Sequence, residues 1–275
     1  MVFLSGVERP HQRSPGHSKP RRPLRPRRDF IRQSTTRIFT SRFMTRQITV
    51  KVRETTLLAP EILRVILAPE QSSCLDFQPG QYISIHHNGQ ERYFSIANAP
   101  RPNGELELHI RRLPGNDFTH YVFERMSCGD PLSVSGPFGM FTLRPPVGRR
   151  LIFVAGGTGF APIKSFVEQH LESKARPPLS LYRGARSGAD LYLDDLCRAW
   201  QRRRLIEYIP VLSEAEEDTA WQGRKGLVHE AVVADQPRLG DCEIYACGPP
   251  AMITALRTSL LGRGLPPGQF HSEGG

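Results

Sequence analysis

Apolar and polar residues alternate along several short segments in the first half of the chain. These segments are 48–52, 83–85, 106–110 and 132–134. A period of two places every second side chain on the same face of a β-strand, so the pattern predicts half-buried antiparallel strands. Turn-forming pairs separate the segments, among them Asn88-Gly89, which strongly favours a hairpin. Short strands with regular turns are typical of a barrel or a sandwich.

The pattern changes after the sequence Pro-Pro-Val-Gly at 145–148. Short apolar runs now alternate with stretches of helical period. The runs are 151–155, 179–182, 206–212 and 244–247, and the predicted helices lie within 163–171, 193–200, 228–234 and 250–262. A continuous apolar strand is expected when both faces of a sheet are covered, and strand–helix alternation predicts a parallel α/β sheet. We therefore expect an all-β domain at 47–146 and an α/β domain at 147–275.

The positive charge of the chain is confined to its first 46 residues. The whole sequence has 37 Lys and Arg against 27 Asp and Glu, a net charge of +10. Residues 1–46 contain twelve of those bases and two of those acids, so the remaining 229 residues are neutral. A neutral body does not support a basic groove, and we expect no nucleic-acid binding by the folded part.

The segment 1–46 is rich in Arg and Pro and poor in apolar residues, which predicts a disordered tail. Three interpretations of it stay open: sequence upstream of a true start at Met44, a targeting segment, or an arm that binds nucleic acid. No apolar run is long enough for a membrane span. The five cysteines are scattered without metal-ligand spacing, so we expect no metal site, reduced thiols and a cytoplasmic location.

Two motifs with candidate chemistry lie where strands of the predicted α/β sheet end. The first is Ala-Gly-Gly-Thr-Gly-Phe-Ala-Pro at 155–162, between an apolar strand and a helix. Glycines allow close approach to a phosphate, a helix N-terminus offers free N–H groups, and Pro162 suits a first helical turn. The second is Cys247-Gly248-Pro249-Pro250, which also joins a strand to a helix. Ligands of open α/β sheets bind at these strand ends, although a glycine turn and a buried cysteine are also compatible with the two patterns.

A third motif, Arg92-Tyr93-Phe94-Ser95, lies in the all-β half. An Arg suits a phosphate, an aromatic residue can stack on a planar ring, and a hydroxyl can bond a ring nitrogen. In this order, the three motifs resemble those of the ferredoxin–NADP reductase superfamily over residues 47–275. Gly129-Asp130 with Gly-Pro-Phe-Gly at 136–139, and the segment 182–192, also resemble family motifs. The chain is most similar to NAD(P)H-flavin reductases and to CDP-6-deoxyhexulose (glucoseen) reductase-like proteins without their iron–sulfur domain.

The resemblance implies a six-stranded Greek-key β-barrel that binds FAD, followed by an α/β domain that binds NAD(P)H. Arg92 would bind flavin phosphates, and Tyr93 and Phe94 belong to the same motif, with Phe94 packed on the isoalloxazine. Ser95 would lie near flavin N5. The other implied flavin-binding residues are His109, Ile110 and Arg111 on one strand, and Gly115 and Thr119 in a diphosphate loop.

For the nucleotide, the resemblance implies a phosphate cradle and a nicotinamide edge. The residues are Gly156, Gly157, Thr158, Gly159 and Pro162 for the cradle, and Cys247, Gly248 and Pro249 for the edge. Ser95, Cys247 and Glu273 would be the catalytic residues. Arg186 is a candidate reader of a 2′-phosphate, whereas Asp190 would favour a free hydroxyl, so the choice between NADH and NADPH stays open.

The implied activity is hydride transfer from NAD(P)H to flavin, followed by electron transfer to free flavin or to a redox protein. Phe94 stands where the family has Tyr, so the lost hydroxyl predicts weak or exchangeable FAD. No cysteine cluster of the C-x₄-C-x₂-C kind is present, so we expect any iron–sulfur centre on a separate partner. Two alternatives remain: a non-catalytic flavin or nucleotide sensor on this scaffold, and nucleic-acid binding through the basic tail.

Overall fold

The computed structural model describes residues 45–70, 74–144, 148–215 and 221–273. The basic tail therefore lies outside the described residues up to position 44, and so does the predicted boundary at 145–147. The first strand begins at Arg46, the last residue of the range assigned to the tail.

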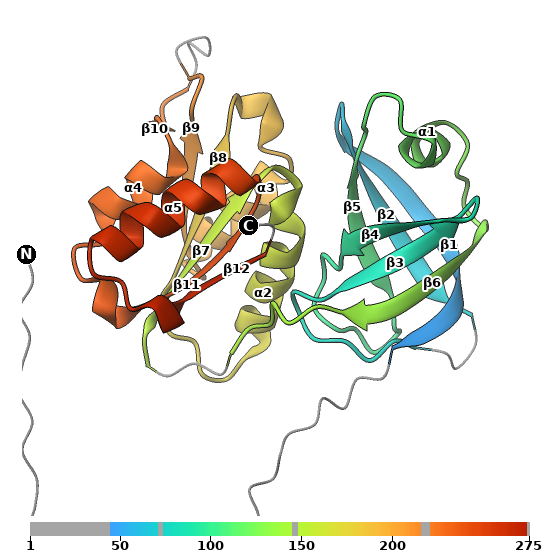
Figure 1. Ribbon diagram of the computed structural model, residues 1–275, viewed down its shortest axis with the longest axis horizontal. Helices are drawn as coiled ribbons and strands as arrows, with labels where there is room; N and C mark the ends of the chain where they lie inside the picture. The colour runs from blue at the N-terminus through green and yellow to red at the C-terminus, as the bar shows by residue number, and fades with distance from the viewer. Residues whose placement is uncertain (1–44, 71–73, 145–147, 216–220, 274–275) are drawn as a thin grey trace, which may run out of the picture. The chain divides into compact units, whose positions relative to one another are not determined.

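The first half of the described chain forms one antiparallel sheet of six strands, coloured blue to green in Figure 1. The strands are β1 (Arg46–Ala59), β2 (Ile62–Pro69), β3 (Tyr82–His87), β4 (Gln90–Ser95), β5 (Leu106–Arg111) and β6 (Pro131–Phe138). Their order is β4-β3-β6-β1-β2-β5, so the last strand lies between β1 and β3. The Ala97 amide, just after β4, donates to the Glu107 carbonyl on β5 at 2.7 Å and brings the two edges of the sheet together. The predicted fold class of this half is confirmed.

The turn between β3 and β4 is the predicted hairpin. His87 pairs with Gln90 across it. Asn88 and Gly89 have positive φ angles of 47° and 72°. Two successive left-handed residues are what a type I′ turn requires, and its twist matches that of the flanking strands. The apolar side chains of these strands face a shared core that includes Ile83, fully buried.

A helix in this half, α1 (Asp117–Glu124), was not predicted from the alternation. The Asn116 side chain caps it by accepting from the Thr119 amide at 3.0 Å. Phe118 and Val122, one turn apart, are both buried. The cap and the four-residue spacing are a readable helix pattern. The segment 115–119, predicted as a loop, is thus the entry to this helix.

The second half forms a parallel sheet, as predicted, and it has six strands. Its strands are β7 (Arg150–Gly156), β8 (Leu179–Ala185), β9 (Glu207–Leu212), β10 (Arg224–Lys225), β11 (Cys242–Cys247) and β12 (Phe270–Glu273). Their order is β10-β9-β8-β7-β11-β12. The two edge strands, β10 and β12, were not predicted because they have only two and four residues.

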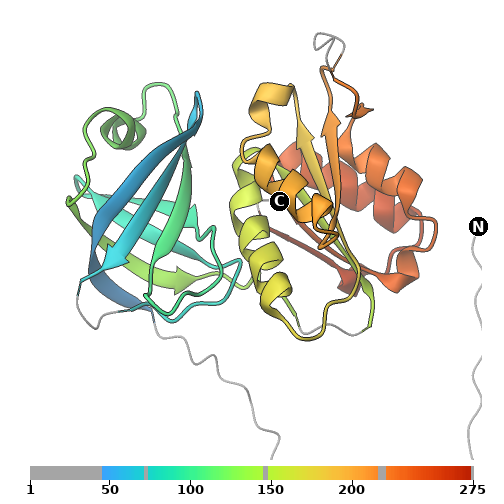
Figure 2. The same cartoon turned by 180° about the vertical axis from the view of Figure 1, so that it is seen from behind.

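Helices cover both faces of the parallel sheet (Figures 1 and 2). They are α2 (Phe160–Glu172), α3 (Asp194–Arg202), α4 (Val228–Asp235) and α5 (Pro250–Gly262), with short 3₁₀ turns η1 (Gly157–Gly159), η2 (Gly188–Asp190), η3 (Leu239–Asp241) and η4 (Pro267–Gln269). Phe153 on β7 belongs to the cluster that includes Phe166 of α2, and Val154 to the cluster that includes Leu256 of α5. Two covered faces explain why β7 is apolar throughout. No helix in the described ranges is long and apolar enough to cross a membrane.

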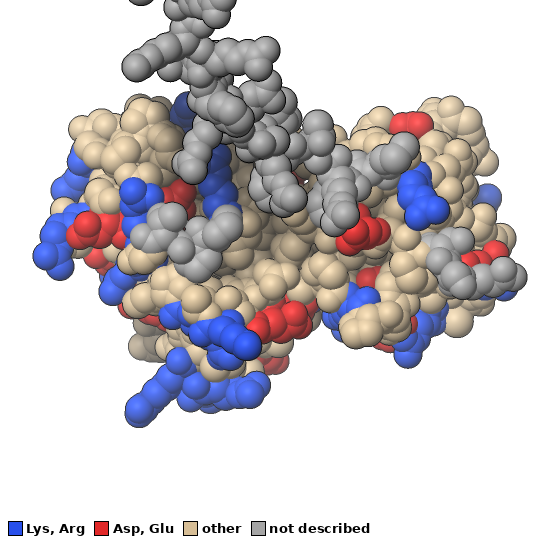
Figure 3. All heavy atoms as spheres, turned by 90° about the horizontal axis from the view of Figure 1, so that it is seen from below, with Lys and Arg blue, Asp and Glu red and all other residues tan. Residues whose placement is uncertain are grey.

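Basic and acidic side chains are mixed on the surface of the described residues. On the face shown in Figure 3, Asp and Glu lie among the Lys and Arg. This mixture agrees with the balance of charges counted for residues 47–275.

Candidate functional site

The two glycine-containing motifs of the α/β half lie side by side. β7 leads through η1 into α2, and β11 leads through Gly248 and Pro249 into α5. The two strands pair in register, with Ala155 opposite Cys247. Both motifs therefore stand at the carboxyl edge of the sheet, where open α/β sheets bind their ligands.

These loops pack closely against glycines at two positions, against backbone at Gly159 and against the flexible Met252 side chain at Gly156. A Cβ on Gly159 would meet the Cys247 carbonyl group and stand 2.6 Å from the Gly248 nitrogen. A Cβ on Gly156 would stand 2.7 Å from the sulfur of Met252. Part of the glycine pattern thus serves loop-to-loop packing, and the same packing brings both motifs to one surface.

The start of α2 is suited to an anion. Neither Gly156, before η1, nor Gly159, before α2, provides a side-chain cap. The Phe160 amide donates to the Gly157 and Thr158 carbonyls, so the N–H groups that can meet a ligand are those of η1, where the partial positive charge of the helix start adds to them. Arg111 of β5 adds a full charge, because its Nη2 lies 3.4 Å from the position of a Cβ on Gly157.

A cavity of about 720 Å³ opens at this edge, within the range of nucleotide-sized sites. Two of its lining residues, Ser95 and Arg111, come from the antiparallel half. The other lining residues come from the ends of the parallel strands and the loops after them: Gly156, Gly157, Thr158, Gly159, Gly184, Ala185, Arg186, Asp190, Val211, Ser213, Gly226, Leu227, Val228, Cys247, Gly248, Pro249, Met252 and Glu273.

A second cavity, of about 250 Å³, is lined by Tyr82, Tyr93, Phe94, Ser95 and Glu273. Ser95 and Glu273 therefore line both cavities. Three of the five lining residues of the second cavity are aromatic, which suits a planar ring. A ring bound in the second cavity and a ligand bound in the larger one would therefore both contact Ser95 and Glu273, and would lie next to each other.

The three residues predicted as catalytic converge at this edge. β12 pairs with β11 so that Glu273 stands opposite Cys247. The Ser95 hydroxyl donates a long hydrogen bond of 3.5 Å to Glu273 Oε2. Ser95 and Glu273 are 178 positions apart in the sequence, so only the fold brings them together.

The electrostatics of this cluster favour neutral groups. Burial raises the pKa of Glu273 to about 7, against a smaller lowering by the Ser95 hydrogen bond. Burial, and then the charge of Glu273, raise the pKa of the Cys247 thiol to about 12. At neutral pH the thiol is protonated and the carboxyl is near its midpoint, so the cluster holds no strong base or thiolate nucleophile.

The predicted flavin motif lies on β4 with its side chains in different settings. The Arg92 guanidinium turns back along its own hairpin, where it bonds the Glu91 carbonyl at 3.0 Å and the Gln90 side chain. Tyr93 is 60% exposed beside the second cavity. Phe94 packs at the edge of the core, with its ring centroid 5.4 Å from that of Phe118. The flavin-phosphate role of Arg92 stays a prediction.

Other predicted cofactor residues lie away from the larger cavity. Ile110 is fully buried in the core of the antiparallel half, and Pro162 is buried in α2. The Thr119 hydroxyl is engaged locally, accepting from the Leu113 amide and donating to backbone carbonyls. Gly115, with a φ of 71°, lies before α1. Their cofactor roles stay predictions, as does that of His109, whose side chain is buried.

The two arginines near the end of β8 have different environments. Arg183 is buried, donates to the Tyr192 carbonyl at 2.6 Å and lies 3.9 Å above the Phe160 ring. It is part of the interior. Arg186 is exposed and lines the larger cavity together with Asp190. The Asp190 carboxylate accepts from the amide and hydroxyl of Ser187, so its position is fixed by the turn.

Several cavity residues were not predicted. Ser213 follows β9, Leu227 and Val228 begin α4, and Met252 lies in the first turn of α5. A general rule would have found Ser213, because it stands at the carboxyl end of a parallel strand like the predicted motifs. Leu227, Val228 and Met252 carry no comparable pattern, since isolated apolar residues at helix starts are common in helical proteins.

Each half of the chain matches the model of a known protein family. Residues 49–143 match the oxidoreductase FAD-binding domain, and residues 153–258 match the oxidoreductase NAD-binding domain. Together the two matches cover the antiparallel sheet and most of the parallel one.

Individual proteins are similar over most of this chain. The CDP-6-deoxy-L-threo-D-glycero-4-hexulose-3-dehydrase reductase of Yersinia pestis is 38% identical over 213 residues, 77% of this chain and 63% of that protein. The terephthalate 1,2-dioxygenase reductase component 2 of Comamonas sp is 34% identical over 233 residues, 83% of this chain and 68% of that protein. The structure of the ferredoxin reductase in carbazole 1,9a-dioxygenase superposes with a TM-score of 0.75 at 29% identity, over 84% of this chain and 69% of that one. The chain thus spans about two thirds of the length of the curated relatives it matches.

Proposed function

Because the chain belongs to the ferredoxin reductase family of FAD- and NAD-binding oxidoreductases, we propose that it passes hydride from NAD(P)H to FAD and electrons onward to an acceptor. The observation that carries the proposal is that two cavities share Ser95 and Glu273. Hydride transfer requires the two reacting rings nearly in contact. A shared edge between a nucleotide-sized cavity and an aromatic cavity meets that requirement.

The larger cavity is the proposed NAD(P)H site. The N–H groups of η1, at the start of α2, and the Arg111 guanidinium supply donors and positive charge for the phosphates. Arg111 thereby acts on the nucleotide from the flavin side. Arg186, directly after β8, lines the cavity together with Asp190 and is the proposed reader of the ribose.

The second cavity is the proposed place of the flavin ring. Its aromatic residues Tyr82, Tyr93 and Phe94 and the Ser95 hydroxyl fit a planar ring with polar nitrogens. A bound flavin supplies the hydride-accepting and electron-donating chemistry. Phe94 offers packing but no hydroxyl, so we propose that FAD is held loosely and exchanges.

The chain's own residues orient the two rings and exclude water. The Ser95 hydroxyl lies within reach of both cavities and is held by Glu273. The protonated Cys247 thiol packs at the nicotinamide edge. Hydride transfer needs no separate strong base, which agrees with a cluster whose pKa values are raised.

The proposed acceptor is a redox protein. The similar proteins are named as reductases of a dehydrase and of a dioxygenase, which pairs each with a partner. We propose the same class of use for this chain, with free flavin as the alternative acceptor.

A spectrum and an activity assay test the proposal. Spectra of the purified protein without and with added FAD should show that added FAD supplies the visible absorbance of bound flavin, and FAD should stimulate oxidation of NAD(P)H. Ser95→Ala should lower the rate about 10- to 100-fold, because it removes one oriented contact at the reacting edge. Binding of flavin and nucleotide without turnover would contradict the enzyme and favour a sensor.

A further inference from the structure

The polar face of β5 is buried. Leu106, Leu108 and Ile110 of this strand lie in the core of the antiparallel half. The alternate residues Glu107 and His109 lie on the opposite face, which alternation would assign to solvent. Both are only 4% exposed, because residues of the parallel-sheet half cover them.

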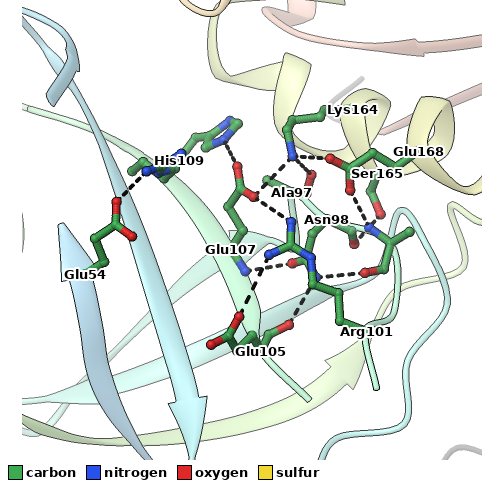
Figure 4. A network of polar contacts seen from close by, with 12 residues as sticks. Glu54, Ala97, Asn98, Arg101, Glu105, Glu107, His109, Lys164, Ser165 and Glu168 are labelled. Carbon is green, nitrogen blue, oxygen red and sulfur yellow. Dashed lines mark hydrogen bonds and ion pairs between the residues drawn. The ribbon is translucent and has the colours of Figure 1, made fainter. Parts of the chain in front are cut away.

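Lys164 of α2 is the first of these covering residues (Figure 4). Its ammonium group, also buried, donates to Glu107 Oε2 at 3.1 Å, to the Ala97 carbonyl at 3.1 Å and to Glu168 Oε1 at 2.6 Å. The other Glu168 oxygen accepts from the Ala99 amide at 3.0 Å. One buried cation thus joins α2 to β5 and to the segment after β4.

Tyr192 is the second covering residue. His109 Nδ1 lies 3.1 Å from the Tyr192 hydroxyl, and His109 Nε2 lies 2.9 Å from Glu107 Oε1. Burial lowers the pKa of His109 despite the opposing effect of Glu107, so the imidazole is neutral. The Glu107 carboxylate can only accept, which assigns the imidazole proton to Nε2. The Tyr192 hydroxyl then donates to Nδ1, and the hydrogen bonds run in one direction from Tyr192 through His109 to Glu107.

This chain of contacts continues to the nucleotide loop. The Tyr192 carbonyl accepts from Arg183 at 2.6 Å, and the Arg183 guanidinium lies over the Phe160 ring. Phe160 is the first residue of α2 and directly follows Gly159. On β5, the next residue on the polar face after Glu107 and His109 is Arg111, which lines the larger cavity beside Gly157.

We propose that Glu107, His109, Lys164 and Tyr192 form an interdomain clamp that sets the distance between strand β5 and the nucleotide loop, and so positions the rings for hydride transfer. These four are positioning residues, since none of them lines the larger cavity. The inference rests on the proposed hydride transfer. It differs from a purely stabilising role because the clamp fixes the same strand that carries Arg111, and a shift of that strand changes the spacing of the two cavities.

Two matched hydroxyl deletions test the clamp in the full-length, FAD-saturated protein. Tyr192→Phe removes one contact between the halves, the hydrogen bond from the Tyr192 hydroxyl to His109. Tyr182→Phe is the control, because its hydroxyl is also buried and bonds Asp235 and Gln236 at 3.0 Å within one half. The readouts are the anaerobic rate of flavin reduction at saturating NAD(P)H, its deuterium isotope effect, the FAD dissociation constant and the melting temperature.

We expect Tyr192→Phe to slow flavin reduction on the order of tenfold, because reacting groups must be held in a near-attack geometry. The isotope effect should rise while FAD binding stays unchanged. Tyr182→Phe should keep the wild-type rate. Equal rates in both variants, or a loss in Tyr192→Phe that follows only its FAD binding, would overturn the clamp.

A double-mutant cycle adds a second test. His109→Gln and Tyr192→Phe should each slow flavin reduction, and the double variant should be no slower than the slower single variant, because both act through one contact. Additive losses would contradict a common pathway. A wild-type protein that does not reduce flavin with NAD(P)H would refute the proposed function and the clamp together, whereas active wild type with an unaffected Tyr192→Phe refutes the clamp alone.

Discussion

Two glutamates, each brought close to the contact between the two halves, have opposite environments. Glu107 is held by Lys164 and His109. Burial raises its pKa, but the His109 hydrogen bond and the Lys164 charge outweigh burial and hold it at about 2. Glu273 has only the long Ser95 hydrogen bond, and burial raises its pKa to about 7.

The different pKa values of the two glutamates suit them to different roles, Glu107 to holding the two halves in place and Glu273 to the reacting edge. A carboxylate whose charge is compensated stays ionised across the physiological range and can hold two domains in place. A partly buried carboxyl that pairs with no cation among the described residues changes its charge near neutral pH, beside the edge that the two cavities share. Burial alone therefore does not identify a functional glutamate. The charged and hydrogen-bonding groups around the carboxyl determine whether its pKa is lowered or raised.

The largest expected effect comes from removing the cation of the clamp. Lys164→Met removes the buried cation shared by Glu107 and the partly buried Glu168, while Arg101, 3.3 Å from Glu107, remains. We therefore expect a loss of about 3 kcal/mol in the free energy of unfolding, the lower end of the range for a broken buried pair. Urea unfolding measures it. Lys51→Met is the control, because Lys51 is 54% exposed in its pair with Glu70 and should change stability by about 0–1 kcal/mol. Equal, small losses would show that Lys164 is not a buried cation.

A smaller effect is the pH dependence of stability, for which the two glutamates have opposite signs. The folded pKa of Glu273 lies near 7 against 4.5 in the unfolded chain, so its contribution is present below pH 4.5 and is lost as the pH rises through 7. Glu107 contributes above pH 4.5 and loses its contribution as the pH falls towards 2.

Urea midpoints measured against pH distinguish the two. Glu273→Gln should remove a decline on the order of 2–3 kcal/mol between about pH 4.5 and about pH 7. Glu107→Gln should remove only the acid-side decline. A common profile for both variants would refute the assigned environments.

The smallest expected effect is kinetic. The rate of flavin reduction should show an inflection near pH 7 in the wild-type protein, spanning about tenfold or less. Glu273→Gln should abolish it, because glutamine stays neutral at every pH. The variant at high pH should resemble wild type at low pH. An inflection that persists in the variant belongs to another group.

Much of the fold was predictable because its elements have regular periods. The run at 151–155 predicted β7, and its apolar character follows from the two helix-covered faces. The helix α1 was not predicted because the strands around it have a period of two, although Phe118 and Val122 have the spacing of a helix. The edge strands β10 and β12 pair with neighbours distant in sequence, which no local pattern records.

The site was predictable where backbone geometry demands particular residues. Gly159 is marked in the sequence because a side chain there would meet the backbone of Cys247 and Gly248. The clamp was not predictable, because Lys164 occupies an ordinary helical position and the polar face of β5 is the usual pattern of a solvent-exposed strand. Only the packing of the second sheet shows that Glu107, His109 and Lys164 are buried together.

An anaerobic titration of the FAD-loaded protein with NAD(P)H tests the central claim most directly. The account predicts that the visible flavin absorbance is lost in proportion to the nucleotide added, since the two cavities meet at Ser95 and Glu273. Nucleotide binding that leaves the flavin absorbance unchanged would contradict it.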